Sequence, residues 1–156
     1  MALYLVQHGK SLPKDADPDQ GLSDEGIAET KRIAQVALNY QVRVAKIQQS
    51  GKKRARQTAE IFAAALHPAG GVEEVSGLKP LDDVKAFAAA IDGTADVMLV
   101  GHLPFMERMT SYLLTGSDGK PIFKFQNSGI VCLEQDPDSN SWAIVWTLMP
   151  KIGAAR

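Results

Sequence analysis

Two histidines in the chain stand directly after apolar, strand-like segments and beside a glycine. His8 follows residues 2–7, and His102 follows residues 96–100 and one glycine. Imidazole at such a position can act as a nucleophile, as a general acid or base, or as a metal ligand. Ligands of open α/β sheets bind outside the carboxyl ends of the strands, so the two rings should share one crevice if their strands are neighbours. His67, at the end of an expected helix, is instead expected on the surface.

A third segment that could do chemistry is the basic run after the strand expected at residues 42–50. Four basic residues occupy the five positions from Lys52 to Arg56, at the start of an expected helix. The partial positive charge of a helix N-terminus repels these cations, so their position there is favourable only if an anion binds nearby. The planar guanidinium of Arg54 suits an oxyanion such as phosphate, and the free N–H groups of a helix beginning at Leu103 would point at the same anion.

These groups together indicate phosphoryl transfer to nitrogen. Neutral His8 would attack phosphorus and become a phosphohistidine, which water then cleaves. Arg54, His102 and helix N–H groups would hold the equatorial oxygens, where the transition-state charge is spread. This chemistry requires no metal and no other cofactor. A metal site built from both histidines and loop aspartates is the alternative, but the chain has no closely spaced ligand pair such as H-x-H or C-x-x-C.

The elements that must position these groups alternate between strand-like and helix-like patterns. Ser23 is a suitable N-cap for the first helix, which has acidic residues in its first turn. The pattern predicts a single domain over residues 1–156: a three-layer α/β/α sandwich whose sheet is mostly parallel and ends in an antiparallel C-terminal hairpin. The expected strands are 2–7, 42–50, 72–75, 96–100, 128–135 and 141–149, and the expected helices are 24–39, 52–66, 81–91 and 103–114.

Composition argues against several classes of function. The 156 residues include 17 basic and 18 acidic side chains, and a formal net charge of -1 gives no signal for nucleic acid or membrane binding. No apolar run is long enough to cross a membrane. The single cysteine, Cys132, cannot form an internal disulfide, so the reducing cytoplasm is the expected compartment. Trp142 and Trp146 are an even number of positions apart on the last expected strand, so their side chains should lie on the same face of the sheet.

Four segments resemble the histidine phosphatase (phosphoglycerate mutase-like) superfamily, and most closely its small branch of SixA-type phosphohistidine phosphatases. The Arg-His-Gly motif of the family corresponds to Gln7-His8-Gly9, and its first helix start corresponds to "GLSDEG" at 21–26. Its "SP..RA.QTAE" segment is matched within residues 50–60, and its "GH.P" motif by residues 101–104. The four matches occur in the family's order and run over nearly the whole chain.

The resemblance implies that His8 is the nucleophile and that Arg54 and His102 bind phosphate. Phosphate-binding contacts are also expected from Gln7, Gly9, Ser11 and Leu103. A chain of this length resembles the branch without the long lid insertions of sugar-phosphate mutases. An open pocket favours a phosphorylated protein, for example a histidine-phosphotransfer protein, over a small phosphate ester. Inorganic phosphate would be the product.

Two departures from the family leave other functions open. Gln7 replaces the first arginine, and Lys10 or Lys52 could restore its charge; the motif proline after Ser50 is Gly51. No general acid is evident, since Asp82 and Asp83 are better explained as helix-start charges, although these and the loop aspartates at 15, 17 and 19 are candidates. A phosphohistidine substrate relaxes this requirement, because its imidazole takes up its own proton near pH 6.5. The alternatives are a weakly active or inactive module that binds phosphoproteins, and a small-molecule phosphomonoesterase.

Overall fold

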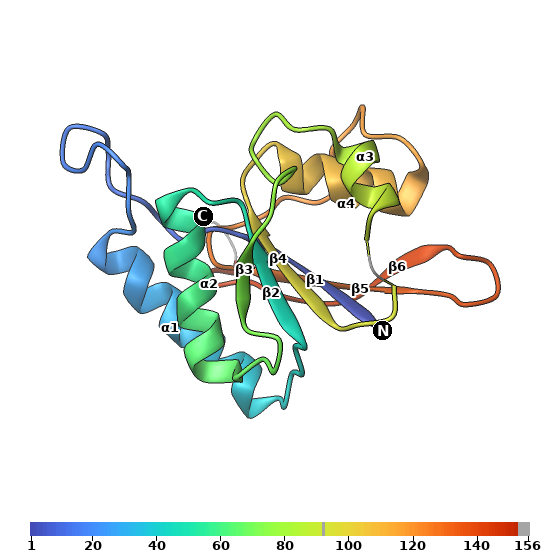
Figure 1. Cartoon of the computed structure of the whole chain (residues 1–156), viewed down its shortest axis with the longest axis horizontal. Helices are drawn as coiled ribbons and strands as arrows, with labels where there is room; N and C mark the ends of the chain where they lie inside the picture. Colours follow the sequence, from blue (N-terminus) through green and yellow to red (C-terminus); the bar gives the residue numbers. More distant parts are fainter. Residues whose placement is uncertain (92, 153–156) are drawn as a thin grey trace.

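A computed structural model describes residues 1–91 and 93–152 of the chain. Within them it has six strands and four helices, in an order that matches the alternation expected from the sequence. Figure 1 shows these elements along the chain. The strands are β1 (Ala2–Gln7), β2 (Lys46–Gln49), β3 (Val72–Glu74), β4 (Val97–Gly101), β5 (Ile130–Gln135) and β6 (Trp142–Leu148), and the helices are α1 (Asp24–Asn39), α2 (Lys53–Leu66), α3 (Val84–Ala89) and α4 (Phe105–Thr115).

The sheet is mixed and has the strand order β3-β2-β4-β1-β5-β6. The pairs β2–β3, β2–β4 and β1–β4 are parallel, whereas β5 is antiparallel to both β1 and β6. The sandwich with a mostly parallel sheet and an antiparallel C-terminal hairpin is therefore confirmed. β1 and β4 are direct neighbours, and their register aligns Gln7 with Gly101. The residues that follow these two strands consequently emerge at the same edge of the sheet.

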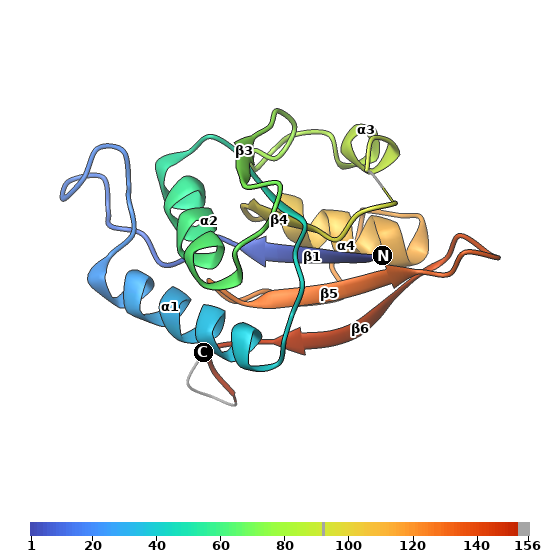
Figure 2. The same ribbon diagram turned by 60° about the horizontal axis from the view of Figure 1, so that its bottom comes forward.

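Helices cover both faces of the sheet and enclose two apolar clusters. Tyr4 and Val6 of β1 pack with buried residues of α1 and α2, such as Ile33 and Phe62. The alternate residues of β1 face the opposite cluster with α3 and α4, as a period of two requires. Figures 1 and 2 show α1 and α2 on one side of the sheet, α3 and α4 on the other, and the loop from β1 to α1 projecting beyond the layers. No helix in the described part of the chain could cross a membrane.

Several predicted boundaries shift because side chains cap or restrict the backbone. The helix expected from residue 81 begins at Val84, since the carboxylate of Asp83 accepts from the N–H groups of Lys85 and Ala86. The helix expected from Leu103 begins at Phe105, with Pro104 as its N-cap residue. A residue that precedes proline is sterically disfavoured in the α region, so Leu103 cannot start the helix. The strand expected from residue 42 begins at residue 46.

A bulge in the C-terminal hairpin overturns the prediction that the two tryptophans share a face. The pairing of β5 with β6 shifts between Cys132 and Leu133, which leaves one extra residue in β6. The extra residue reverses the alternation of side chains. As a result, Trp146 packs with Tyr4 on the α1 and α2 side, while Trp142 packs on the α3 and α4 side.

Candidate active site

The parallel pairing of β1 with β4 brings the two strand-end histidines together. The rings of His8 and His102 have centroids 5.0 Å apart and planes inclined by 51°. The backbone N–H of His8 donates to the carbonyl of Gly101 at 3.0 Å, so the hydrogen bonding of the two strands continues past their ends. This separation allows both rings to contact one tetrahedral anion.

His8 is held in the tautomer that a nucleophile needs. Its Nδ1 lies 2.7 Å from the carbonyl oxygen of Gly9. A carbonyl can only accept, so Nδ1 carries the proton in this hydrogen bond and Nε2 of the neutral ring keeps a free lone pair. The backbone at His8 is held in turn by Asn127, whose side-chain amide donates to the His8 carbonyl at 2.8 Å.

His102 is buried more deeply and has a different partner. It is 1% exposed, and its Nε2 lies 2.6 Å from the hydroxyl of Ser50 at the end of β2. The N–H of Lys52 donates to the same hydroxyl oxygen at 3.4 Å, which leaves the hydroxyl proton free to donate to Nε2. Nδ1 then carries the ring proton, and it is buried without a hydrogen-bond partner among residues 1–91 and 93–152. An orphaned N–H of this kind is suited to receive an anionic oxygen.

Both rings are neutral near pH 7 in this environment. Burial lowers the pKa of His8 to about 4, and the positive charge of Arg54 contributes in the same direction. Burial likewise lowers the pKa of His102 to about 3, with smaller contributions from His8, Arg54 and Lys52. A neutral imidazole retains the lone pair that nucleophilic attack requires.

Arg54 lies in the first turn of α2, close enough to both rings for its positive charge to lower the pKa of each. Its side chain is half-buried, and desolvation lowers the pKa of its guanidinium. Lys52, the N-cap residue of α2, gives the helix no side-chain cap, and no acidic residue occupies the first turn. In the described chain neither Arg54 nor Lys52 takes part in an ion pair, whereas Lys10 pairs with Glu25 at 2.7 Å. The positive field at the helix start is therefore available to an anion.

The loop after His8 packs so closely at Gly9 that a side chain at this position would disrupt it. A Cβ at Gly9 would lie 2.7 Å from the hydroxyl of Thr30, closer than real Cβ contacts allow. The N–H of Gly9 donates to the hydroxyl of Thr58, which itself donates to the carbonyl of Arg54. Thr58 therefore ties the His8 loop to the turn that carries Arg54.

Sequence reasoning gave no role to Ser50, Thr58 or Asn127. Ser50 and Thr58 fall within the family-like segment 50–60, which was the available signal for them. Asn127 lies 119 residues from its partner His8, and no local pattern marks it.

The predicted phosphate-binding residues Gln7, Leu103 and Ser11 make the following contacts in the structure. Gln7 ends β1, and its Oε1 is buried without a partner in the described part of the chain. Leu103 packs against the α4-side cluster, and the N–H of Met106 already donates to the His102 carbonyl, so this turn offers fewer free donors than expected. Ser11 pairs through its backbone with Leu22. Direct contacts of these residues with phosphate stay predictions.

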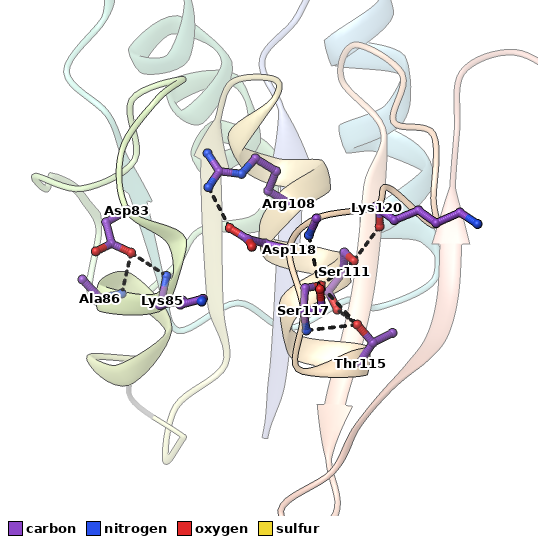
Figure 3. Close-up of polar contacts among 10 residues, drawn as sticks. Asp83, Lys85, Ala86, Arg108, Ser111, Thr115, Ser117, Asp118 and Lys120 are labelled. Atoms are coloured by element: carbon purple, nitrogen blue, oxygen red, sulfur yellow. Dashed lines mark hydrogen bonds and ion pairs between the residues drawn. The ribbon is translucent and has the colours of Figure 1, made fainter.

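Three of the five candidate general acids have other partners. Asp82 accepts from the N–H of Lys79. Figure 3 shows Asp83 capping α3 through the N–H groups of Lys85 and Ala86. Asp17 accepts from Lys53, and this hydrogen bond is the largest cause that lowers its pKa to about 2, so it stays ionised near neutral pH. Within residues 1–91 and 93–152, no group of three or more His, Cys, Asp or Glu side chains could hold a metal ion.

Comparison with known proteins agrees with this arrangement. The sequence profile of the histidine phosphatase superfamily (branch 1) matches residues 3–82. An uncharacterized protein of Picosynechococcus is 31% identical over an alignment of 144 positions, which covers 85% of this chain and 84% of that protein. The phosphohistidine phosphatase SixA of Escherichia coli is 24% identical over 156 residues, with 96% and 94% of the two chains covered.

The fold also matches a solved structure over almost its full length. The structure of the protein histidine phosphatase SixA complexed with tungstate superimposes with a TM-score of 0.84 and 24% identity, covering 96% of this chain and 97% of that one. The strand-end histidines, the arginine at the start of α2 and the matched profile thus have one common explanation: the chain belongs to the histidine phosphatase superfamily (branch 1).

Proposed function

We propose that the protein is a phosphatase that forms a covalent phosphohistidine on His8 and removes phosphate from a phosphohistidine side chain of a protein partner. The observation that carries this proposal is the pairing of two neutral imidazoles, 5.0 Å apart, in which His8 has a free Nε2 and His102 an orphaned Nδ1. We place the reaction in the reducing cytoplasm, since the chain has one cysteine.

The proposed reaction has two in-line steps at phosphorus. In the first, the lone pair of His8 Nε2 forms a P–N bond while the P–N bond of the substrate breaks. A substrate ring protonated at its other nitrogen leaves as neutral imidazole, and His8, with its proton on Nδ1, becomes the phosphorylated imidazolium. In the second step, water attacks phosphorus, neutral His8 leaves, and the water protons remain on the phosphate that is released.

The surrounding charges stabilise the transferring group. Arg54 and the Nδ1–H of His102 would each bind equatorial oxygens, where the charge of the transition state is spread. The Gly9 carbonyl accepts from Nδ1 of His8 and would stabilise the imidazolium that forms. This set of donors performs the reaction without a metal ion or another cofactor.

A phosphohistidine substrate fits the site better than a phosphate ester. An alcohol or sugar leaving group needs a proton donor, and Asp17, Asp82 and Asp83 are held by other partners. Protonated phosphohistidine needs no such donor, because imidazole binds its proton near pH 6.5. The name of the SixA relative supports the same substrate class.

The proposal can be tested by trapping the covalent intermediate. The protein is mixed with a histidine-containing protein that has been phosphorylated chemically with phosphoramidate, and the reaction is quenched in alkali. We expect an acid-labile phosphate on His8 by mass spectrometry. The His8→Ala variant should neither carry it nor release phosphate, whereas His67→Ala, which changes a histidine outside the site, should do both. Phosphate release that survives in His8→Ala would rule out the covalent mechanism.

A second candidate function is a module that binds phosphoproteins without turnover. Gln7 favours it, because a neutral amide replaces the cation of the family motif. Binding of the phosphorylated protein without phosphate release, by wild type under conditions in which E. coli SixA turns over, would support this candidate over the enzyme.

A further inference from the structure

A groove of about 860 Å³ runs along the β5–β6 side of the molecule. Gln7 and Leu103, which adjoin the two histidines in sequence, lie at one end of it. Residues 123–127 form one wall and residues 147–152 the other, and we call this the C-terminal groove. A chain lying in the groove would therefore pass close to the histidine pair.

Both walls of the C-terminal groove are fixed by hydrogen bonds. The side-chain amide of Gln126 donates to the carbonyl of Lys151 and accepts from its N–H, at 2.9 and 3.0 Å. Arg32 of α1 donates to the carbonyl of Pro150, and the N–H of Phe125 donates to Glu107 of α4. The groove is thus preformed, which lowers the entropic cost of binding a segment in it.

The groove carries more positive than negative charge. It is lined by three lysines, at 10, 124 and 151, and by one acidic residue, Glu29, which is 8% exposed. Lys10 is paired with Glu25, whose carboxylate also interacts electrostatically with Lys151. Neither Lys124 nor Lys151 forms an ion pair within 4.0 Å of any described residue.

The depression on the other side of the site has the opposite balance. It has a volume of about 850 Å³ and contains Lys52 and Lys79 together with three carboxylates, those of Glu74, Asp82 and Asp83. The charge of the C-terminal groove is therefore a local property, in a chain whose formal net charge is -1.

The charge of the groove indicates which kind of segment it would bind. A polypeptide with acidic side chains brings carboxylates for the lysines.

We propose that the C-terminal groove docks an acidic segment of the protein that carries the phosphohistidine. This inference rests on the proposed function and adds the chemistry of the partner: carboxylates flank its phosphorylated residue and lie against Lys124 and Lys151. Phe123 packs against the buried Phe125, with ring centroids 5.6 Å apart, and adds a partly exposed apolar surface to the same wall.

Two synthetic peptides of equal length test the groove directly. Both carry the stable phosphohistidine analogue phosphoryltriazolylalanine, one between glutamates and one between lysines, and their dissociation constants are measured by fluorescence anisotropy. At low salt the acidic peptide should bind about tenfold more tightly. This preference should shrink at 0.5 M salt, because both lysines lie near solvent.

Replacing lysines by glutamate tests which residues cause the preference for the acidic peptide. The double variant Lys124→Glu/Lys151→Glu should abolish or invert the preference for the acidic peptide. Lys120→Glu is the matched control, since Lys120 is exposed in the same connection between α4 and β5, and its side chain extends away from the hydrogen bonds around Ser111 in Figure 3. It should retain the preference.

Other outcomes would overturn the docking proposal. The first is equal binding of both peptides by wild type. The second is a loss of preference in Lys120→Glu as large as in the double variant. The third is displacement of both peptides to the same extent by phosphatidylglycerol vesicles, which compete as an anionic surface. Because binding is measured without turnover, each is distinct from failure of the trapping experiment on His8, which would remove the enzymatic function instead.

Discussion

The ends of β1 and β4 carry the same residue type at adjacent positions, yet they give it opposite environments. At the end of β1, His8 is half-buried, directs Nδ1 to a carbonyl and keeps Nε2 free. At the end of β4, His102 is 1% exposed, directs Nε2 to a hydroxyl and keeps Nδ1 without a partner in the described chain. The backbone partner leaves one ring ready to react, and the hydroxyl partner leaves the other ready to donate.

The difference shows that a hydrogen-bond partner can decide the role of a residue more than the residue type does. Either ring alone is chemically able to attack phosphorus or to bind phosphate. Only His8 combines access with a free lone pair on Nε2 in these contacts. We therefore propose that His8 attacks and that His102 binds the anion; the first prediction below tests this division, and the others test the groups around the two rings.

The largest effect is expected from replacing each ring. His8→Asn should abolish phosphoenzyme formation and reduce turnover of a phosphohistidine protein to background. His102→Ala removes one donor to the transferring group, so it should lower turnover by about 10²–10³-fold while His8 still becomes phosphorylated. His102→Asn keeps an N–H near the position of Nδ1 and should lower turnover less. Mass spectrometry of quenched samples distinguishes the His8 variant from the His102 variants. A phosphate found on His102 in wild type would reverse the assignment.

Restoring the cation of the family motif should increase activity. Gln7→Arg adds a charged, forked donor beside His8, and charge-assisted hydrogen bonds to phosphate are about twice as strong as neutral ones. We expect kcat/KM for an aryl phosphate to rise about tenfold. Gln7→Leu, which removes the amide at similar size, should not raise it. Unchanged or lower activity in Gln7→Arg would mean that residue 7 does not contact the phosphate.

A smaller effect is expected at the hydroxyl that holds His102. Ser50→Ala removes the partner of Nε2 and frees the ring to adopt either tautomer. We expect about a fivefold loss in kcat/KM, and a shift of the ¹⁵N resonances of His102 toward a mixture of tautomers. A purely structural role for Ser50 would leave the tautomer unchanged, so the NMR spectrum decides between the two explanations.

The smallest effect concerns stability as a function of pH. Folding lowers the pKa of His8 to about 4 and of His102 to about 3, whereas an unfolded histidine has a pKa near 6.5. Between pH 6.5 and these values the unfolded chain binds more protons, so the free energy of unfolding decreases as the pH falls. We expect Tm to be about 5 °C lower at pH 5 than at pH 7.

The His102→Asn variant provides the comparison, since it lacks one of the two titrating rings. Calorimetry should show a smaller decrease in its Tm between pH 7 and pH 5. An equal decrease in both proteins would mean that other groups control the loss of stability.

Local patterns in the sequence were sufficient to predict the elements and the principal candidate residues. The apolar runs before His8 and His102 end in loop-forming glycine segments, so both rings could be placed at strand ends. Ser23 was expected to cap the first helix, and its hydroxyl accepts from the N–H of Gly26. Capping and periodicity act over a few residues, which is why a single sequence reveals them.

Contacts between distant segments could not be predicted in the same way. No local pattern shows that β2 lies beside β4, which is what brings Ser50 to His102. The same holds for Asn127 and His8. The face of Trp146 was predicted incorrectly because alternation assumes a regular strand, and a single extra residue reverses it.

The bulge in β6 also has an evolutionary consequence. Thr147, Leu148 and Met149 of the C-terminal groove follow the extra residue, so it determines which of their side chains line the wall. Loss of one residue from the tight turn at 136–140 would alter only a surface connection. Loss of one residue beside Val145 would move every later side chain of β6 to the opposite face of the sheet. Homologues that keep the same partner should therefore tolerate gaps in the turn and conserve the length of the strand that follows.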